Sequence, residues 1–348
     1  MQREKLIKTV SDLGEFTLIE RIKQIIPQTA NSDVLVGIGD DTAVIRISEN
    51  LALIATCDIQ VEDQHFRLKH ISGYQLGRRA IAVNLSDIAS MGGKPQFALV
   101  SLGLPPKLKV DYFDHLFEGI RDELNRYSAC LIGGNLTKTD HKLIVDITLL
   151  GEVHPGRIIT RSGAKPGDKI YVTGKLGESG AGFQVLEHFG KDYPVSYDHM
   201  VNAHLQPIPR VEAGKLIADY QIATAMIDIS DGLASDLNHI CLMSGVGAEI
   251  YQDQLPLSDQ LSEISQISNK SQLEFALYSG EDYELLFTAK PEISLEKLNE
   301  LSQKLSLPIT EIGRIIDKNE GFILVDAHSK RLNLKPKGWD HFAKKSGG

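Results

Sequence analysis

The alternation of apolar, β-rich runs with helical patterns, on both sides of one glycine- and proline-rich break, constrains the fold of this chain more than any other feature. The break is RSGAKPGD at residues 161–168. Strand and helix patterns alternate before it, and they begin again directly after it with KIYVTG at 169–174. Because such alternation is typical of α/β proteins, we predict two α/β domains joined at this break, in a strand order that the spacing does not give.

The composition restricts the class of protein. A chain of 348 residues exceeds one compact core, and its 42% hydrophobic and 24% charged residues are typical of soluble globular proteins. The net charge of −9 offers no general attraction for nucleic acid. Cys57, Cys130 and Cys241 form no C-x-x-C pair, and no apolar run approaches the ~18 residues of a membrane span. We therefore predict a cytoplasmic protein with no nucleic-acid partner and no membrane partner.

Aspartates beside small residues, at predicted turns or strand ends, are the main chemical feature of the sequence. A single aspartate next to glycine often only forms a turn or caps a helix. Carboxylates from several segments, with almost no histidine or cysteine among them, are instead the ligands that Mg²⁺ uses together with phosphate oxygens. We therefore predict that the set, if not every member, binds Mg²⁺ and a phosphorylated ligand. The segments are GIGDD (37–41), ATCDIQVEDQHF (55–66), NLSDIASMGG (84–93) and IDISDGLASDL (227–237).

The motifs of better-known phosphotransferases and hydrolases are missing. The sequence contains no G-x-x-x-x-G-K-[ST] P-loop, no H-R-D with D-F-G pair and no G-x-S-x-G nucleophile motif. GESGAG at 177–182 has the spacing of a glycine-rich loop after a strand, but close packing of a helix on a strand explains it equally well. We expect metal-assisted catalysis without a covalent nucleophile.

A set of segments, in one order along the chain, resembles the thiamine-monophosphate kinase family. This family is part of a superfamily that includes aminoimidazole ribonucleotide synthetase and selenophosphate synthetase. The similarity runs from about Gly14 to Phe342, and it sets the expected domain limits at 14–153 and 161–342. SGEDYEL and GWDHF (338–342) resemble this family more than its relatives. The ordered set is GIGDDTAV, ATCD…HF, AVNLSDIASMG, LIGGN, TRSGAKPGD, IDISDGLASDL and SGEDYELLF.

The resemblance implies a fold and a reaction. The strands of the N-terminal α/β domain pair across a homodimer, and a nucleotide cleft lies between the two domains. ATP is the expected co-substrate, several Mg²⁺ ions are the expected cofactors, and thiamine monophosphate is the expected acceptor. The γ-phosphoryl group passes directly to the acceptor, in the last step of thiamine diphosphate biosynthesis. No phosphoenzyme is expected, because phosphoryl transfer needs positioning and charge neutralisation more than covalent help.

The resemblance also implies site residues at the matching motif positions. The expected metal ligands are Asp41, Thr56, Cys57, Asp58, Asp87, Asn135, Asp228 and Asp231. The expected nucleotide-binding residues are Gly134, Asn135, Arg161 and Ser230, and those expected at the thiamine phosphate are His65, Glu281 and Trp339.

Several of these positions have simpler interpretations. Arg161 could be a surface charge of the linker, Trp339 could only pack on the core, and His65 could be an ordinary polar residue. Cys57 stands where we expect threonine, and Asn135 stands where an aspartate is familiar in the family. A metal contact of Cys57 would use its backbone carbonyl, and Asn135 offers an oxygen without a charge.

Two other functions stay open. The chain could be a different ATP-using synthetase of the same superfamily, although no reactive cysteine lies in a glycine-rich N-terminal segment, which disfavours selenophosphate synthetase. It could also be a non-catalytic module that binds nucleotide or thiamine diphosphate. The number of aspartates argues against such a module, because pure binding needs fewer metal ligands.

Overall fold

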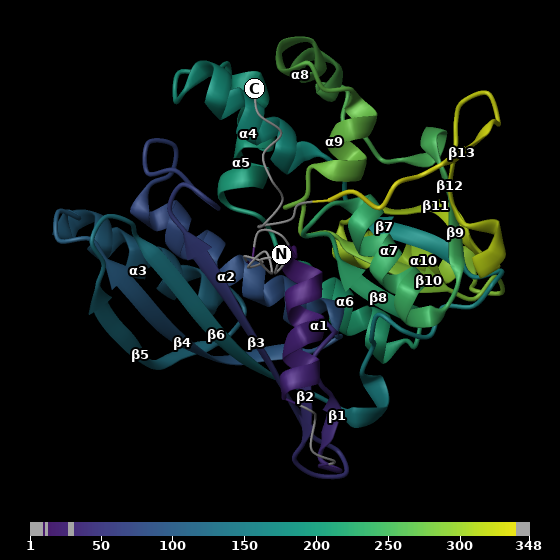
Figure 1. Ribbon diagram of the computed structural model, residues 1–348, viewed down its shortest axis with the longest axis horizontal. Coiled ribbons are helices and arrows are strands. Elements are labelled where there is room, and N and C mark those ends of the chain that lie inside the picture. The colour runs from purple at the N-terminus through teal and green to yellow at the C-terminus, as the bar shows by residue number, and fades with distance from the viewer. Residues whose placement is uncertain (1–9, 11–12, 27–30, 339–348) are drawn as a thin grey trace, which may run out of the picture.

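The strands form two sheets, one in each half of the chain (Figure 1). The structure is a computed structural model that describes residues 10, 13–26 and 31–338. Within these residues the first sheet has the order β1-β2-β3-β6-β4-β5, and the prediction of an α/β chain with a sheet in each half is confirmed. Its strands are β1 (Val34–Val36), β2 (Ala43–Arg46), β3 (Ala52–Val61), β4 (Lys94–Leu104), β5 (Cys130–Lys138) and β6 (Ile144–Val153).

In the first sheet, β6 separates two strands that a helix connects. β3 leads through helix α2 (Gly73–Ser90) into β4, and β6 lies between them, antiparallel to both. β3 and β4 therefore run in the same direction, as a crossover helix requires, without being neighbours. Helix α3 (Val110–Arg126) then leads into β5, which pairs in parallel with β4. The sequence patterns predict helices at 73–91 and about 109–127, and strands at 51–57, 96–102, 129–135 and 142–153, but they do not predict the insertion of β6.

The second sheet is also mostly antiparallel, and its order is β13-β12-β9-β11-β7-β10-β8. Only the neighbours β12 and β9 run parallel among the described strands of this sheet. In this half the sequence patterns predict strands at 169–174, 224–229 and 283–289, so β9 and β11 to β13 were not predicted. The strands are β7 (Lys169–Thr173), β8 (Ala223–Asp228), β9 (Gly247–Tyr251), β10 (Leu285–Ala289), β11 (Ile309–Ile316), β12 (Phe322–Val325) and β13 (Arg331–Asn333).

Helices cover both sheets and join the two halves. Helix α1 stands in front of the junction between the halves in Figure 1. Helix α6 lies on α2 so closely that a Cβ atom at Gly214 would be 1.9 Å from the carbonyl oxygen of Ala89. The remaining helices are α1 (Glu15–Ile25), α4 (Glu178–Phe189), α5 (Asp198–Leu205), α6 (Val211–Asp219), α7 (Leu233–Ser244), α8 (Leu261–Ser268), α9 (Gln272–Tyr278) and α10 (Leu295–Leu305).

Helix α2 is the most buried helix of the N-terminal half, and local sequence signals set its ends. Ser72 and Gln75 form a capping box at its start. Gly92, just beyond its end, has a φ of +73°, a left-handed conformation that favours glycine. On the side facing α3, a Cβ atom at Gly77 would lie 2.0 Å from the carbonyl oxygen of Leu116. Glycine is therefore required for the contact between these two helices.

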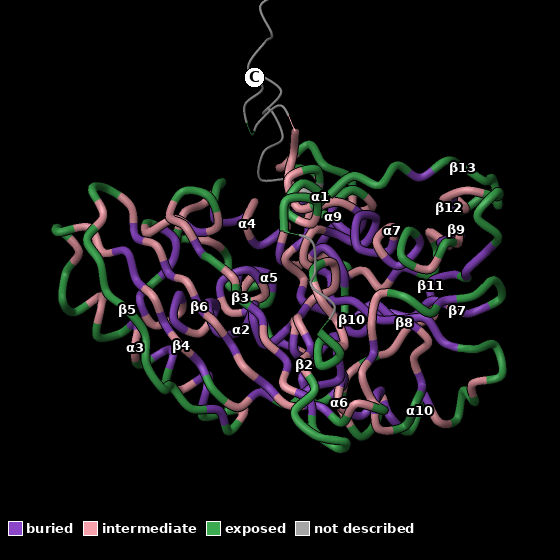
Figure 2. Tube along the Cα trace, turned by 60° about the horizontal axis from the view of Figure 1, so that its bottom comes forward, coloured by how far each residue is buried: buried purple, intermediate pink, exposed green. Residues whose placement is uncertain are grey.

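The outer edge of the first sheet is exposed. Every residue of β5 is exposed, including the large apolar Leu131, Ile132 and Leu136. Figure 2 shows this strand at one end of the molecule, far from the second sheet. An edge strand of this length, with a row of apolar side chains, is unusual for a surface that stays uncovered. Separately, none of the described helices has both the length and the apolar character that crossing a membrane requires.

Replacing Gly77 by Ala should destabilise the protein, although alanine usually stabilises a helix by about 1 kcal/mol relative to glycine. The new methyl group would meet the backbone of α3, so we expect the free energy of unfolding to fall by more than about 2 kcal/mol in urea denaturation.

The matched control is Gly245→Ala, at the end of α7, where a Cβ atom would have no neighbour within 4 Å. Its left-handed conformation, with a φ of 69° and a ψ of 33°, should cost alanine only about 1 kcal/mol. Equal effects of the two substitutions would mean that the close α2–α3 contact does not matter for stability.

Candidate active site

A cleft of about 1740 Å³ lies between the two halves and is lined by both of them. The N-terminal half contributes α1, the loop before β2 and the stretch from β3 to the start of α2. The C-terminal half contributes Arg161, the turn after β8 and the loop before β10. One wall carries the apolar side chains of Ile19, Ile22 and Ile26 from α1. The cleft therefore offers an apolar wall beside a strongly acidic floor.

Three carboxylates from distant parts of the chain meet in this cleft. Asp41 lies in the loop before β2, Asp87 on α2 and Asp228 at the end of β8. One oxygen of each lies within 4.8 Å of the others. Asp58, on β3, is close enough to raise the pKa of Asp87. The sequence predicted that these four aspartates act together, and the fold brings them together.

Hydroxyl groups and one guanidinium group hold the carboxylates in place. Arg161 donates hydrogen bonds from Nε, at 2.9 Å, and from Nη2 to Oδ1 of Asp41. Two of the hydroxyl donors are serines on α2, one helical turn apart. The hydroxyl donors are Ser90 to Asp41, Ser86 to Asp228 at 2.6 Å, and Thr56 to Asp87.

Burial and mutual repulsion raise the pKa values of this group. Burial, followed by the charge of Asp41, raises the pKa of Asp228 to about 8. Burial and then the charges of Asp58, Asp228 and Asp41 hold the pKa of Asp87 well above its usual value. Burial and then Asp41 raise the pKa of Asp40 to about 6. Without a bound cation, part of the group therefore keeps protons near neutral pH.

The donor set fits Mg²⁺. Its side chains present carboxylate oxygens, with hydroxyl oxygens beside them, and Mg²⁺ prefers such hard ligands. Thr42, next to Asp41, has a buried hydroxyl oxygen with no hydrogen-bond partner among the described residues. A bound cation would offset the repulsion between the three carboxylates. The cation, or a phosphate group bound to it, would also give the Thr42 hydroxyl oxygen a partner.

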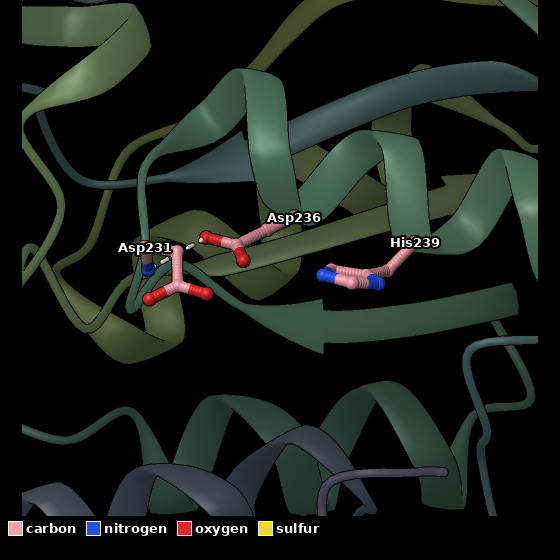
Figure 3. Close-up of side chains that lie close together, drawn as sticks. All are labelled: Asp231, Asp236 and His239. Carbon is pink, nitrogen blue, oxygen red and sulfur yellow. Dashed lines mark hydrogen bonds between the residues drawn. The ribbon is translucent and has the colours of Figure 1, made fainter. Parts of the chain in front are cut away.

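A second group, formed by Asp231, Asp236 and His239, lines the same cleft (Figure 3). Asp236 accepts hydrogen bonds from the backbone N–H groups of Asp231 and Gly232, both at 3.1 Å, and so shapes the turn before α7. Burial, followed by the charge of Arg161, lowers the pKa of His239 to about 4. His239 is therefore neutral at physiological pH. Asp236 thus extends the group of carboxyl side chains onto α7, and the neutral imidazole of His239 follows one helical turn later.

Two of the three residues predicted at the acceptor phosphate, His65 and Glu281, lie near each other in the cleft. Nδ1 of His65 accepts a hydrogen bond of 3.0 Å from the N–H of Val61. Glu281 has a φ of +58°, a strained conformation for this residue type. Burial raises the pKa of Glu281, but Arg79, His204 and His65 outweigh it and lower that pKa to about 2. Glu281 therefore stays ionised, with His65 nearby.

Some of the predicted residues do not join the cleft, or join it differently. Gly134 and Asn135 lie on the exposed edge strand β5, with β4 and β6 between them and β3. The side chain of Cys57 faces the opposite side of β3 from Thr56 and contacts Asp146 and Thr148. Trp339 lies outside the described residues. The predicted residues that do line the cleft are Asp41, Thr56, Cys57, Asp58, His65, Asp87, Arg161, Asp228, Ser230, Asp231 and Glu281.

Sequence reasoning missed several residues of the site. Arg79 lies in the helix predicted at 73–91 and was given no functional role, although it lies seven residues before Ser86 and thus on the same helix face. His204 and Phe183 carry no local motif, and their rings lie 5.4 Å apart beside the cleft. The position of Arg79 was a usable signal, whereas the other two depend on tertiary packing.

Comparison with known proteins agrees with this arrangement. The family described as AIR synthase related protein, N-terminal domain, matches residues 39–153, and the corresponding C-terminal domain family matches residues 165–326. The chain matches both domain families, and it has two sheets with a carboxylate-lined cleft between them. It therefore belongs to the class of AIR synthase related proteins.

Close relatives narrow this class. Curated thiamine-monophosphate kinases from Bacillus subtilis (strain 168) and Escherichia coli (strain K12) are 38% and 39% identical to this chain, over 95% of its length in each case. The matches cover 100% and 98% of those proteins. A solved structure described as AaThiL complexed with AMPPCP and TMP matches with a TM-score of 0.84 and 35% identity, over 97% of this chain and 100% of that one. The chain belongs to the thiamine-monophosphate kinase family.

The raised pKa of Asp228 makes a prediction about stability and pH. The ordinary pKa of an aspartate is 3.8, and that of Asp228 in the folded chain is about 8, so the folded state holds the extra proton between these values. The free energy of unfolding should therefore fall as pH rises from about 4 to about 8 in metal-free buffer. Asp228→Asn should make this decline shallower, because asparagine has no proton to lose and still accepts from Ser86.

Urea denaturation at several pH values in EDTA measures the effect, with exposed Asp192→Asn as the control. Adding Mg²⁺ at pH 8 should raise the melting temperature of the wild type more than that of Asp228→Asn. An unchanged pH profile in Asp228→Asn would contradict the buried, repelling cluster.

Proposed function

We propose that this chain catalyses the ATP-dependent phosphorylation of thiamine monophosphate to thiamine diphosphate. The observation that carries the proposal is the meeting of Asp41, Asp87 and Asp228 in a cleft between the two halves. Family membership supports it, because the similar AaThiL structure is described as a complex with AMPPCP, an ATP analogue, and with TMP, the acceptor expected here. ATP-using phosphoryl transfer is the chemistry that suits such a carboxylate site.

The proposed reaction is a direct transfer. A phosphate oxygen of thiamine monophosphate attacks the γ-phosphorus of ATP and forms the new P–O bond. The bond between the γ-phosphorus and the oxygen that bridges it to the β-phosphorus breaks, and ADP leaves with that electron pair. No residue of the chain forms a covalent intermediate, in keeping with the absence of a nucleophile motif. The chain itself binds and aligns both phosphate groups.

Mg²⁺ ions are the proposed cofactors. Asp41, Asp58, Asp87 and Asp228 would hold them, with Asp231 and the hydroxyl of Thr56 close by. When bound, Mg²⁺ neutralises charge on the phosphate oxygens of both substrates. Arg161 donates two hydrogen bonds to Oδ1 of Asp41 and so orients this carboxylate.

The acceptor side of the cleft is assigned to His65, Glu281 and Trp339. Gly338, the last described residue, supports the assignment of Trp339. A Cβ atom at Gly338 would lie 2.9 Å from the carbonyl oxygen of Asp231, so the chain reaches the cleft directly before Trp339. Ser230 and Arg161 are assigned to the nucleotide. We also propose that the chain has two domains, with limits at 14–153 and 161–342, and that it is located in the cytoplasm.

A homodimer explains the position of Gly134 and Asn135. Both residues lie on β5, outside the cleft of their own chain. The exposed apolar side chains of β5 support pairing of this strand with a second copy. We propose that the two residues serve the nucleotide site of the partner subunit.

The rival functions have less support. Another synthetase of the superfamily would need a different acceptor, and the curated relatives from Bacillus subtilis and Escherichia coli, which match over 95% of this chain, are thiamine-monophosphate kinases. A module that only binds nucleotide has no need for so many buried carboxylates, which destabilise the folded chain unless a cation is present.

Incubation with Mg·ATP and thiamine monophosphate should yield thiamine diphosphate and ADP in equal amounts, detected by chromatography. Asp87→Asn should lower kcat at least about a thousandfold, because a carboxylate in the charge-neutralising set is lost. Its circular dichroism spectrum should match the wild type, and exposed Asp192→Asn should keep full activity. Wild-type turnover in excess EDTA, or full activity of Asp87→Asn, would exclude the proposed metal-assisted mechanism.

A complementation experiment tests the shared site. Homodimers of Asp87→Asn and of Asn135→Ala should each be nearly inactive. When the two variants are mixed in equal amounts and refolded, half of the dimers contain one copy of each. If Asn135 acts on the partner subunit, each of these mixed dimers has one active site that contains neither substitution. Activity should then return to about a quarter of the wild-type value. No recovery would place Asn135 in the site of its own chain or outside both sites.

A further inference from the structure

One buried arginine joins the two halves of the chain beside the cleft. Arg79, on α2, is only 1% exposed. Its Nε donates to Oε1 of Gln60 on β3 at 3.3 Å, and its Nη1 donates to the carbonyl oxygen of His204 on α5. Its Nη2 donates to Oε1 of Glu281, in the loop before β10. One planar fork thus binds acceptors from the first sheet and from two elements of the C-terminal half.

The segment that carries Glu281 is strained and bound to the acidic turn after β8. Gly280, Glu281 and Tyr283 all have positive φ, of +67°, +58° and +51°. The N–H of Glu281 donates to the carbonyl oxygen of Ser230 at 2.7 Å. A Cβ atom at Gly280 would lie 2.5 Å from the same oxygen. The position of the Glu281 backbone is therefore coupled to the turn that carries Ser230 and Asp231.

The Glu281 carboxylate is held from two sides. Arg79 binds Oε1, and Nδ1 of His204 lies 3.4 Å from Oε2. Nδ1 of His204 also lies 3.3 Å from the hydroxyl oxygen of Ser179. The Glu281 side chain is nevertheless 30% exposed, and it faces the cleft. An ion pair that only stabilised the fold would not need a strained backbone that leaves the Glu281 carboxylate partly open to the cleft.

We propose that Arg79 is a positioning residue that acts through Glu281 and fixes this carboxylate for the phosphate acceptor. The inference rests on the proposed function, because it needs an acceptor in the cleft. Arg79 does not touch the acceptor. It holds Glu281 against the relaxation that the strained backbone would otherwise favour, and it does so from the opposite half of the chain.

The test compares Michaelis constants for the two substrates. Arg79→Lys keeps the charge but loses the fork that binds three acceptors. We expect KM for thiamine monophosphate to rise at least about tenfold, the effect of one charge-assisted hydrogen bond, while KM for ATP changes less than about twofold. Arg79→Lys in a Glu281→Gln background should add little further change in KM, because the arginine acts through this glutamate.

Arg78→Lys is the matched control. Arg78 is on the same helix and also joins the two halves, through Glu123 at 2.7 Å and Gln206 at 2.8 Å, but it has no contact with Glu281 among the described residues. This control should change stability without separating the two KM values. Gln60→Leu removes only the Nε acceptor of Arg79, so it should raise KM for thiamine monophosphate by a smaller factor and serves if Arg79→Lys does not fold.

Equal rises of both KM values, or fully additive effects of Arg79→Lys and Glu281→Gln, would overturn the inference and leave the proposed function standing. A wild type that forms no thiamine diphosphate, with Arg78→Lys equally inactive, would instead refute the proposed function itself and this inference with it.

Discussion

The repulsion between the carboxylates of Asp41, Asp87 and Asp228 is the interaction around which the structure is arranged. Three aspartates with oxygens within 4.8 Å of one another would move apart in a flexible chain. Here each is attached to a different part of the fold (a loop, a helix and a strand end) and accepts a hydrogen bond from the hydroxyl group of Ser90, Thr56 or Ser86. The fold thus maintains an electrostatically unfavourable arrangement that a cation with phosphate groups would relieve.

Helix α2 makes this arrangement possible because it contacts both halves of the chain. Along one helix face it carries Arg79, Ser86, Asp87 and Ser90, and all four bind or belong to the groups in the cleft. On its other sides, glycines and alanines allow α3 and α6 to approach its backbone. Small residues at these contacts therefore let a buried helix pack closely against helices on two sides.

The sequence predicted the parts of the site that depend on local chemistry. Aspartates beside small residues at strand ends indicated the metal set, and the fold places Asp41, Asp58, Asp87 and Asp228 together. The order of the strands was not predictable, because β6 inserts between β3 and β4 through pairing with residues far away in the sequence. The contact of His204 with Glu281 was hidden for the same reason. Asn135 could be recognised from LIGGN, but its place on an exposed edge strand could not, since a motif does not indicate the side of the sheet on which it lies.

The exposed strand β5 has a consequence for the life of the newly made chain. A row of unpaired backbone groups with Leu131, Ile132 and Leu136 beside it is a template onto which any other extended segment can add. A copy with this edge uncovered is therefore the form most exposed to aggregation. In the proposed homodimer a second copy would bury the edge, so the concentration of the chain would set how much of it escapes aggregation.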